Sequence, residues 1–203
     1  MRIWFGKQGD LRWIGHRDLM RCMERLFRRA DLPLALSEGF HPKPRMTFPS
    51  ALAVGIEAGG EVMELEINRP MTADDIHHRL KRHAVPGLEI RSVDVLPPQS
   101  PRVRVVGGVY ETVVPAEARP QLAERIDAIK AGQGSLVQRN PERPPVDLRL
   151  QLTELSLLGG VLRFGLRAGE QGSAGPRDVL AALGLVDFER QGGLLRRVAV
   201  QTG

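Results

Sequence analysis

The sequence has few of the residues on which metal and disulfide sites are built. Cys22 is the only cysteine among the 203 residues. One thiol cannot close a disulfide within the chain or supply a cysteine-built zinc or iron–sulfur site. This usage is typical of the reducing cytoplasm, where we expect the protein to act. Cys22 falls in a helical pattern beside Met23, which favours a buried small apolar residue over a reactive thiol.

Long apolar runs are also missing. The apolar stretches are interrupted by Arg, Glu or Gly and stay well short of the roughly 18 residues that span a bilayer. The N-terminal stretch from Met1 to Lys7 has no apolar core and no cleavage site, so we expect neither secretion nor a membrane partner. With 42% apolar and 26% charged residues, the composition is that of a folded globular protein.

Lysine is scarce, and the positive charge is concentrated at one end. Of the 29 basic residues, 25 are Arg and four are Lys. Residues 1–48 hold ten basic and five acidic residues, a difference that equals the whole net charge of +5. The other 155 residues hold 19 of each sign. A cationic end indicates an anionic partner, and Arg suits bidentate contacts to phosphate.

Hydrophobic periodicity predicts the same element order twice. Residues 1–98 show strand patterns at 2–7, 34–37, 61–68 and 88–95, and helix patterns at 17–30 and 72–83. After the proline-rich residues 97–101, strand patterns recur at 103–114, 146–157, 161–167 and 195–201, with helices at 116–131 and 176–183. Both halves have β-α-β-β-α-β order. We therefore expect an α+β fold of two tandem ferredoxin-like units, in domains 1–98 and 102–203.

A segment of more than twenty residues without a clear period separates the predicted strands at 34–37 and 61–68. Such segments are uncommon inside compact domains and are often functional. Prolines at 42 and 44 favour extended backbone, so His41, Lys43 and Arg45 are expected to project to one side and to suit a phosphate backbone. Phe40 and Phe48 are expected to anchor the ends of the loop. The alternative is a surface loop with solvated charges.

The first predicted helix carries a second cationic element. Arg21, Arg25 and Arg28 recur at i, i+4 and i+7, with Arg17 and Arg29 nearby. A helix needs a polar outer face in any case, so the spacing alone does not establish a binding surface. We expect the surface that binds nucleic acid or a partner to comprise Lys7, Arg12, His16, Arg17, Arg21, Arg25, Arg28, Gly39, Phe40, His41, Lys43 and Arg45.

Catalysis is a weaker hypothesis. His16 is a candidate general acid or base, with His41 as its partner and Asp18 to orient one of them, as in metal-independent RNA cleavage. Alternatively, His16 packs against or caps the end of the helix. The spacing of these residues has no metal-site signature, and the chain has no phosphate-cradling glycine loop and no nucleophile elbow. We expect no bound metal and no cofactor.

Four stretches form a specific combination: RIWFGK at 2–7, GDLRWIGHRDLMR at 9–21, ER at 24–25 with RRA at 28–30, and SEGFHPKPRMTF at 37–48. Together they resemble the radical-SAM-linked proteins, an uncharacterised bacterial family of unknown function. That family usually has Ser, Leu and Asn where this chain has Gly15, Arg17 and His41, which argues against a catalytic role for position 41. The residues that keep the family pattern, and so become the preferred site residues, are His16, Asp18, Gly39 and Arg45.

The resemblance implies a context linked to RNA or to its modification, and it implies no known reaction. Members of that family often occur beside, or fused to, a radical-SAM protein with a cobalamin-binding-like region, and near a ribonuclease E/G-like gene. A radical-SAM cluster needs three cysteines, so a chain with Cys22 alone would serve such an enzyme by recruiting its substrate.

Three functions follow from these observations. We expect a non-catalytic accessory protein that binds RNA (tRNA or rRNA), a radical-SAM modification enzyme, or both, through its basic N-terminal surface. Charge reversal at Arg21, Arg25 and Arg45 is then expected to abolish binding. The alternatives are a metal-independent ribonuclease that uses His16 and a purely protein–protein adaptor.

Overall fold

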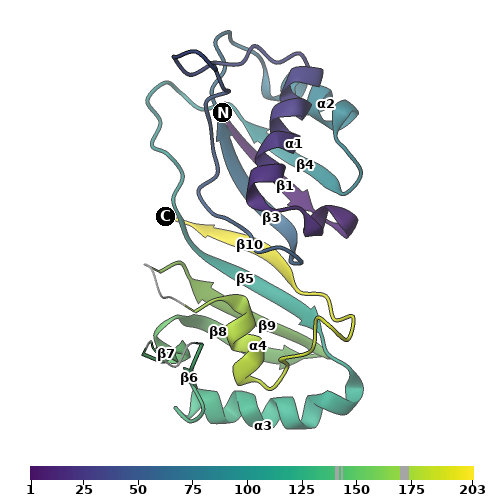
Figure 1. The fold of residues 1–203 in the computed structure, drawn as a ribbon, viewed down its shortest axis with the longest axis vertical. Helices are drawn as coiled ribbons and strands as arrows, with labels where there is room; N and C mark the ends of the chain where they lie inside the picture. Colours follow the sequence, from purple (N-terminus) through teal and green to yellow (C-terminus); the bar gives the residue numbers. More distant parts are fainter. Residues whose placement is uncertain (140–141, 143, 170–173) are drawn as a thin grey trace. The chain divides into compact units, whose positions relative to one another are not determined.

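The computed structural model describes residues 1–139, 142, 144–169 and 174–203 and divides into two compact units. Unit 1 comprises Met1–Arg104 with Gly203, and unit 2 comprises Val105–Thr202. Each unit combines helices with an antiparallel sheet, so the predicted α+β class is confirmed (Figure 1). Among the described residues, no helix has both the length and the apolar character needed to cross a bilayer.

Unit 1 has one sheet and two helices. Its strands are β1 (Arg2–Lys7), β2 (Met46–Thr47), β3 (Glu57–Leu65) and β4 (Leu88–Asp94), and its helices are α1 (His16–Arg29) and α2 (Ala73–His83). The strands lie in the order β4-β1-β3-β2, and all neighbours are antiparallel. The element order of unit 1 agrees with the predicted β-α-β-β-α-β order.

The core of unit 1 forms between the helices and the strands. Ile3 and Phe5 of β1 alternate with outward-facing residues, as a half-buried strand requires, and pack in one cluster with Leu26 and Phe27 of α1. The helix α2 begins after Thr72, whose side chain accepts a hydrogen bond from the Asp75 N–H at 3.2 Å. Thr72 is therefore the N-cap of α2.

The second strand of unit 1 is not where the sequence pattern predicts it. Residues 34–37 form only isolated bridges, Leu34 with Ile67 and Leu36 with Pro44, whereas β2 lies inside the segment expected to be irregular. The Arg45 N–H donates to the Ala35 carbonyl at 2.9 Å, so residues 34–37 fold back on the segment that was expected to be a loop. Because Pro44 has no N–H, this pairing stays short.

Unit 2 repeats the element order with more interruptions. Its strands are β5 (Val105–Val113), β6 (Leu136–Val137), β7 (Val146–Asp147), β8 (Leu152–Leu158), β9 (Val161–Arg167) and β10 (Arg196–Thr202), and its helices are α3 (Arg119–Lys130) and α4 (Pro176–Ala182). The main sheet has the antiparallel order β10-β5-β9-β8, and β6 pairs separately with β7.

The strand predicted at 146–157 is broken in the structure. Asp147 accepts a hydrogen bond from the Arg149 N–H at 3.0 Å and starts a short 3₁₀ turn, Leu148–Leu150. The guanidinium of Arg149 lowers the pKa of Asp147 to about 2 through a side-chain hydrogen bond. An Asp that satisfies the backbone of a turn competes with strand pairing, which explains the interruption.

Two glycines of unit 1 give a matched stability prediction. Gly87 (φ +83°) and Gly9 (φ +58°) both have left-handed backbone, but a Cβ on Gly87 would overlap the Gln8 carbonyl oxygen, whereas a Cβ on Gly9 would meet nothing within 4 Å. We expect Gly9→Ala to cost about 1 kcal/mol of unfolding free energy from backbone strain alone. Gly87→Ala should cost about 3 kcal/mol because the overlap adds to the strain. Urea unfolding measures both losses, and equal values would contradict the close approach of the Gln8 carbonyl to Gly87.

Candidate nucleic-acid interface

The helix α1 separates an apolar face from an arginine-rich face. Leu19, Met23, Leu26 and Phe27 are buried against the sheet. At 100° per residue the opposite face gathers five arginines within about a third of the helix circumference. These are Arg17, Arg21, Arg25, Arg28 and Arg29. The helix begins without a side-chain cap because Gly15 stands at its N-cap position.

Two of these five arginines have a carboxylate partner. Arg21 contacts Asp18 at 3.3 Å and Arg28 contacts Glu24 at 2.9 Å, both on the exposed surface. Exposed pairs of this kind contribute little, so a phosphate can replace the carboxylate at small cost. The guanidinium groups of the other three form no hydrogen bond or ion pair with any residue that the structure describes. They are Arg17, Arg25 and Arg29.

A groove of about 610 Å³ runs along one side of α1. Its apolar lining comes from Leu11, Ile14 and Val85, and its charged lining comes from Asp18, Arg25, Arg28 and Arg29. Cys22 also lines the groove and is only partly buried, whereas a buried residue was expected. Partial burial raises the pKa of the Cys22 thiol, and the positive charges of the two nearby arginines lower it in part.

The proline-containing loop is an ordered hairpin. The N–H of Ser37 donates to the Lys43 carbonyl at 2.8 Å, and the Lys43 N–H donates to the Ser37 hydroxyl at 3.0 Å. The bridge between Leu36 and Pro44 continues this pairing toward the sheet. At the tip, Gly39 has φ +110°, a backbone conformation that favours glycine.

The two phenylalanines of this segment have different environments. Phe48 packs edge-on against Phe5 and His16, with ring centroids at 6.2 and 5.5 Å, and so anchors its end of the segment as expected. Phe40 was expected to do the same, but its side chain is fully exposed, at 101%. The expectation for Phe40 is wrong because the hairpin stem, and not an aromatic contact, holds the tip in place.

The basic side chains of the loop are only partly available. Arg45 donates from Nε to the Leu36 carbonyl at 3.2 Å and lies 3.6 Å from Glu66, so its guanidinium supports the hairpin. His41 and Lys43 are exposed, and their side chains have no hydrogen-bond or ion-pair partner among the described residues. Of the three basic side chains expected to face a ligand, only His41 and Lys43 are therefore available.

His16 is not hydrogen-bonded to its proposed catalytic partners among the described residues. Its ring packs on Phe48 at the N-terminal end of α1, and within the described ranges no hydrogen bond joins it to Asp18 or His41. The cavity beside His16 has only about 10 Å³ of space for the centre of a water molecule, which is too little for a phosphate group. No group of three His, Cys, Asp or Glu among the described residues could hold a metal ion.

Two more of the predicted site residues lie near the turn that follows β1. Lys7 is only 2% exposed, and its ammonium lies 3.4 Å from the carbonyls of Arg12 and Ile14. It lies inside unit 1 and not on its surface, so its predicted place in the binding surface is wrong. Arg12 donates to the Gly9 carbonyl at 2.9 Å and stacks 4.7 Å over Trp13.

Trp13 is an exposed aromatic that was not among the predicted site residues. Its side chain is 59% exposed in the 3₁₀ turn Gly9–Trp13, under the guanidinium of Arg12. The signal available in the sequence was an aromatic residue directly after an arginine in a turn. An arginine stacked on an exposed tryptophan is a common arrangement at nucleic-acid surfaces.

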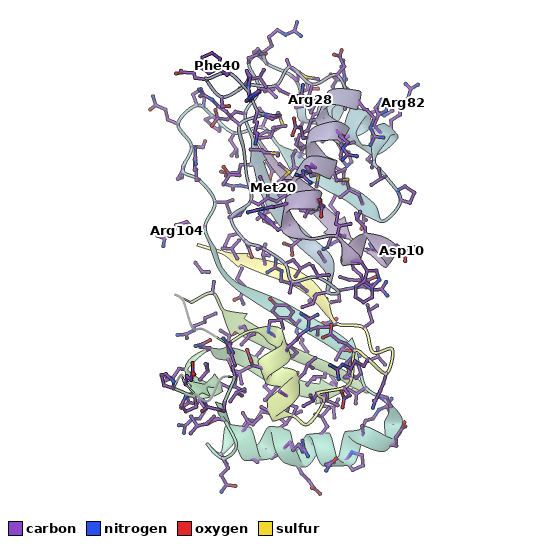
Figure 2. All side chains as sticks on the ribbon, in the orientation of Figure 1. Asp10, Met20, Arg28, Phe40, Arg82 and Arg104 are labelled. Carbon is purple, nitrogen blue, oxygen red and sulfur yellow. The ribbon has the colours of Figure 1, made fainter. Side chains whose placement is uncertain are left out.

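The cationic residues therefore extend along unit 1 and do not meet at one point. Figure 2 shows Phe40 and Arg28 toward one end of the unit and Asp10, in the turn after β1, toward the other. The arginine face of α1 spans the distance between these ends. This arrangement suits an extended polyanion better than a compact ligand.

Comparison with known proteins gives a family but no described activity. No curated protein matches the chain. A solved structure, described as an unknown protein from Galdieria sulphuraria, is similar at 14% identity over 100% of this chain and 97% of that chain, with a TM-score of 0.28. A family model matches residues 1–176. The chain therefore belongs to DUF2344, a family described as an uncharacterised protein conserved in bacteria.

Proposed function

We propose that this chain is a non-catalytic accessory protein that binds RNA through the arginine face of α1. One observation carries the proposal. Arg17, Arg25 and Arg29 are exposed on that face and have no ion-pair or hydrogen-bond partner among the described residues. Arg21 and Arg28 of the same face are partly neutralised by carboxylates three and four residues before them, whereas these three guanidinium groups present their full charge to a ligand.

The geometry of the helix supports a polyanion as the ligand. From Arg17 to Arg29 the helix axis rises about 18 Å, a length that suits several consecutive phosphates. Guanidinium groups bind phosphate through two parallel hydrogen bonds, and they stack on bases as well. The apolar groove beside the helix lets the stems of Arg25 and Arg29 lie against the protein while their charged ends reach solvent.

The salt dependence of binding tests the proposal. A single-stranded RNA that contacts three arginines should give a slope of about −2 in a plot of log Kobs against log salt concentration. The slope should approach about −3.5 if Arg21 and Arg28 also turn from their carboxylates to phosphates. Fluorescence anisotropy with a labelled RNA at several salt concentrations measures this slope. An absence of RNA binding at low salt would contradict the proposal.

The finer parts of the proposal concern the partners. We place the protein in the cytoplasm, where it would bind tRNA or rRNA and present it to a modification enzyme of the radical-SAM class. The single thiol of Cys22 excludes a three-cysteine cluster within this chain, so such an enzyme would be a separate partner.

Two other functions remain as alternatives with distinct outcomes. A ribonuclease would cleave RNA in EDTA and lose that activity on His16→Ala. An adaptor without nucleic acid would retain its enzyme partner in nuclease-treated extract, lose it when Arg17, Arg25 and Arg29 are replaced, and show no RNA binding at low salt.

A further inference from the structure

Phe40 is the exception among the phenylalanines of this chain. Five of the six are buried or partly buried, whereas the Phe40 ring is fully exposed at the tip of a hairpin. An exposed Phe contributes little to folding, because it buries no surface and leaves a large apolar ring in water. A single exposed apolar side chain is ordinary on a protein surface, so the structure and charge around the ring decide what it does.

The hairpin holds this ring in a defined place. Two hydrogen bonds between Ser37 and Lys43, at 2.8 and 3.0 Å, close the loop. The guanidinium of Arg45 braces the stem through the Leu36 carbonyl. The tip is thus an ordered platform, which lowers the entropy cost of binding against it.

Positive charge adjoins the ring. His41 and Lys43 follow Phe40 by one and three residues, and both side chains are exposed without a partner among the residues that the structure describes. An aromatic face with neighbouring cations is the arrangement on which single-stranded nucleic acids bind, with a base on the ring and phosphates on the cations. A lipid surface fits less well, since Phe40 is the one large apolar side chain among the described residues of the tip.

We propose that Phe40 stacks on an unpaired nucleobase, so that the RNA bound by this protein is single-stranded where it meets the hairpin tip. This inference rests on the proposed RNA-binding function and adds the ligand class. A base within a duplex offers no free face, whereas a looped or terminal base does. The stacking is tolerant of sequence because every base has a π face.

The test compares four proteins on two ligands. The proteins are the wild type and the variants Phe40→Ala, Phe40→Tyr and Phe40→Leu. The ligands are a single-stranded RNA of about 12 nucleotides, long enough for one binding site, that carries one 2-aminopurine, and the same strand annealed to its complement. Because the ring is exposed, none of the substitutions should disturb folding, which circular dichroism verifies.

Stacking predicts a specific pattern of affinities. Phe40→Ala and Phe40→Leu should weaken binding of the single strand by about tenfold, Phe40→Tyr should bind like the wild type, and binding of the duplex should change little. Fluorescence of 2-aminopurine should fall when the wild type binds and should fall less with Phe40→Ala.

Three results would contradict the proposal that Phe40 stacks on a base. Equal affinities of wild type and Phe40→Ala for the single strand, with binding still lost on removal of the α1 arginines, would overturn the stacking and leave the proposed function. Wild-type affinity of Phe40→Leu would overturn it too, because an apolar contact without a π face would then suffice. Failure of the wild type to bind either ligand at low salt would overturn both proposals.

Discussion

Replacing Arg17, Arg25 and Arg29 together by alanine should weaken the binding of single-stranded RNA by about 100-fold at about 0.1 M salt. The expected size follows from counterion release, which contributes about 0.7 log units per neutralised phosphate at this salt concentration. Three lost contacts therefore remove about two log units. The salt slope of the variant should become shallower by about 2. Anisotropy titrations between about 0.05 and 0.3 M salt measure both quantities.

A matched variant separates the location of the charges from their number. Arg69, Lys81 and Arg82 are exposed residues of the same unit that lie outside α1 and the hairpin. Their replacement by alanine removes the same three charges but should weaken binding only slightly, through the long-range field. Equal losses from the two triple variants would show that net charge, and not the face of α1, attracts the RNA.

The structure also changes the expected effect of single arginines. Charge reversal at Arg21, Arg25 and Arg45 was expected to abolish binding, but Arg21 contacts Asp18 and Arg45 lies near Glu66. A change at either position alters an intramolecular pair as well as a surface charge. Replacing Arg17, Arg25 and Arg29 therefore tests RNA binding without altering an intramolecular ion pair among the described residues.

Replacing Lys7 by alanine should lower the free energy of unfolding by about 3 kcal/mol. Lys7 is buried in unit 1, and two carboxylates, Glu57 and Glu61, are buried on the neighbouring strand β3. Removing the Lys7 ammonium takes the donor from the carbonyls of Arg12 and Ile14 and a positive charge from the interior that holds both carboxylates, which costs far more than the loss of a surface pair. Urea denaturation followed by circular dichroism measures the change.

A second lysine provides the control. Lys43 is exposed at the hairpin, so Lys43→Ala should change the unfolding free energy by less than about 0.5 kcal/mol. It should reduce RNA affinity and the salt slope, whereas Lys7→Ala should leave both unchanged in the folded protein. If Lys7→Ala unfolds like the wild type and binds RNA weakly, then Lys7 acts in binding and not as an interior charge.

The elements with a strong period were predictable from the sequence. The strand at 2–7 and the apolar spacing of Leu19, Met23 and Leu26 correspond to β1 and α1. The short strand β2 was not predictable, because two residues carry no period and their pairing depends on a distant segment, residues 64–65. Local propensity gave no reason to place a strand among the prolines of that loop.

The candidate site was only partly predictable. Sequence spacing placed the arginines on one face of α1, since helix geometry alone fixes that relation. It could not distinguish the buried Lys7 from the exposed Lys43, because both lysines occur in basic surroundings. It also gave Phe40 and Phe48 the same role, although one is exposed and the other packs on Phe5.

The amino-acid sequence by itself determined the repeated order of strands and helices, the concentration of charge in the first 48 residues, and the arginine face of α1. These properties depend on neighbours that lie within a few residues along the chain. The tertiary structure alone decided which charges are exposed, which arginines are paired, and that the hairpin presents Phe40 to solvent. Burial and pairing depend on contacts between residues that are distant in sequence, such as Arg45 with Glu66, and such contacts exist only after the chain has folded.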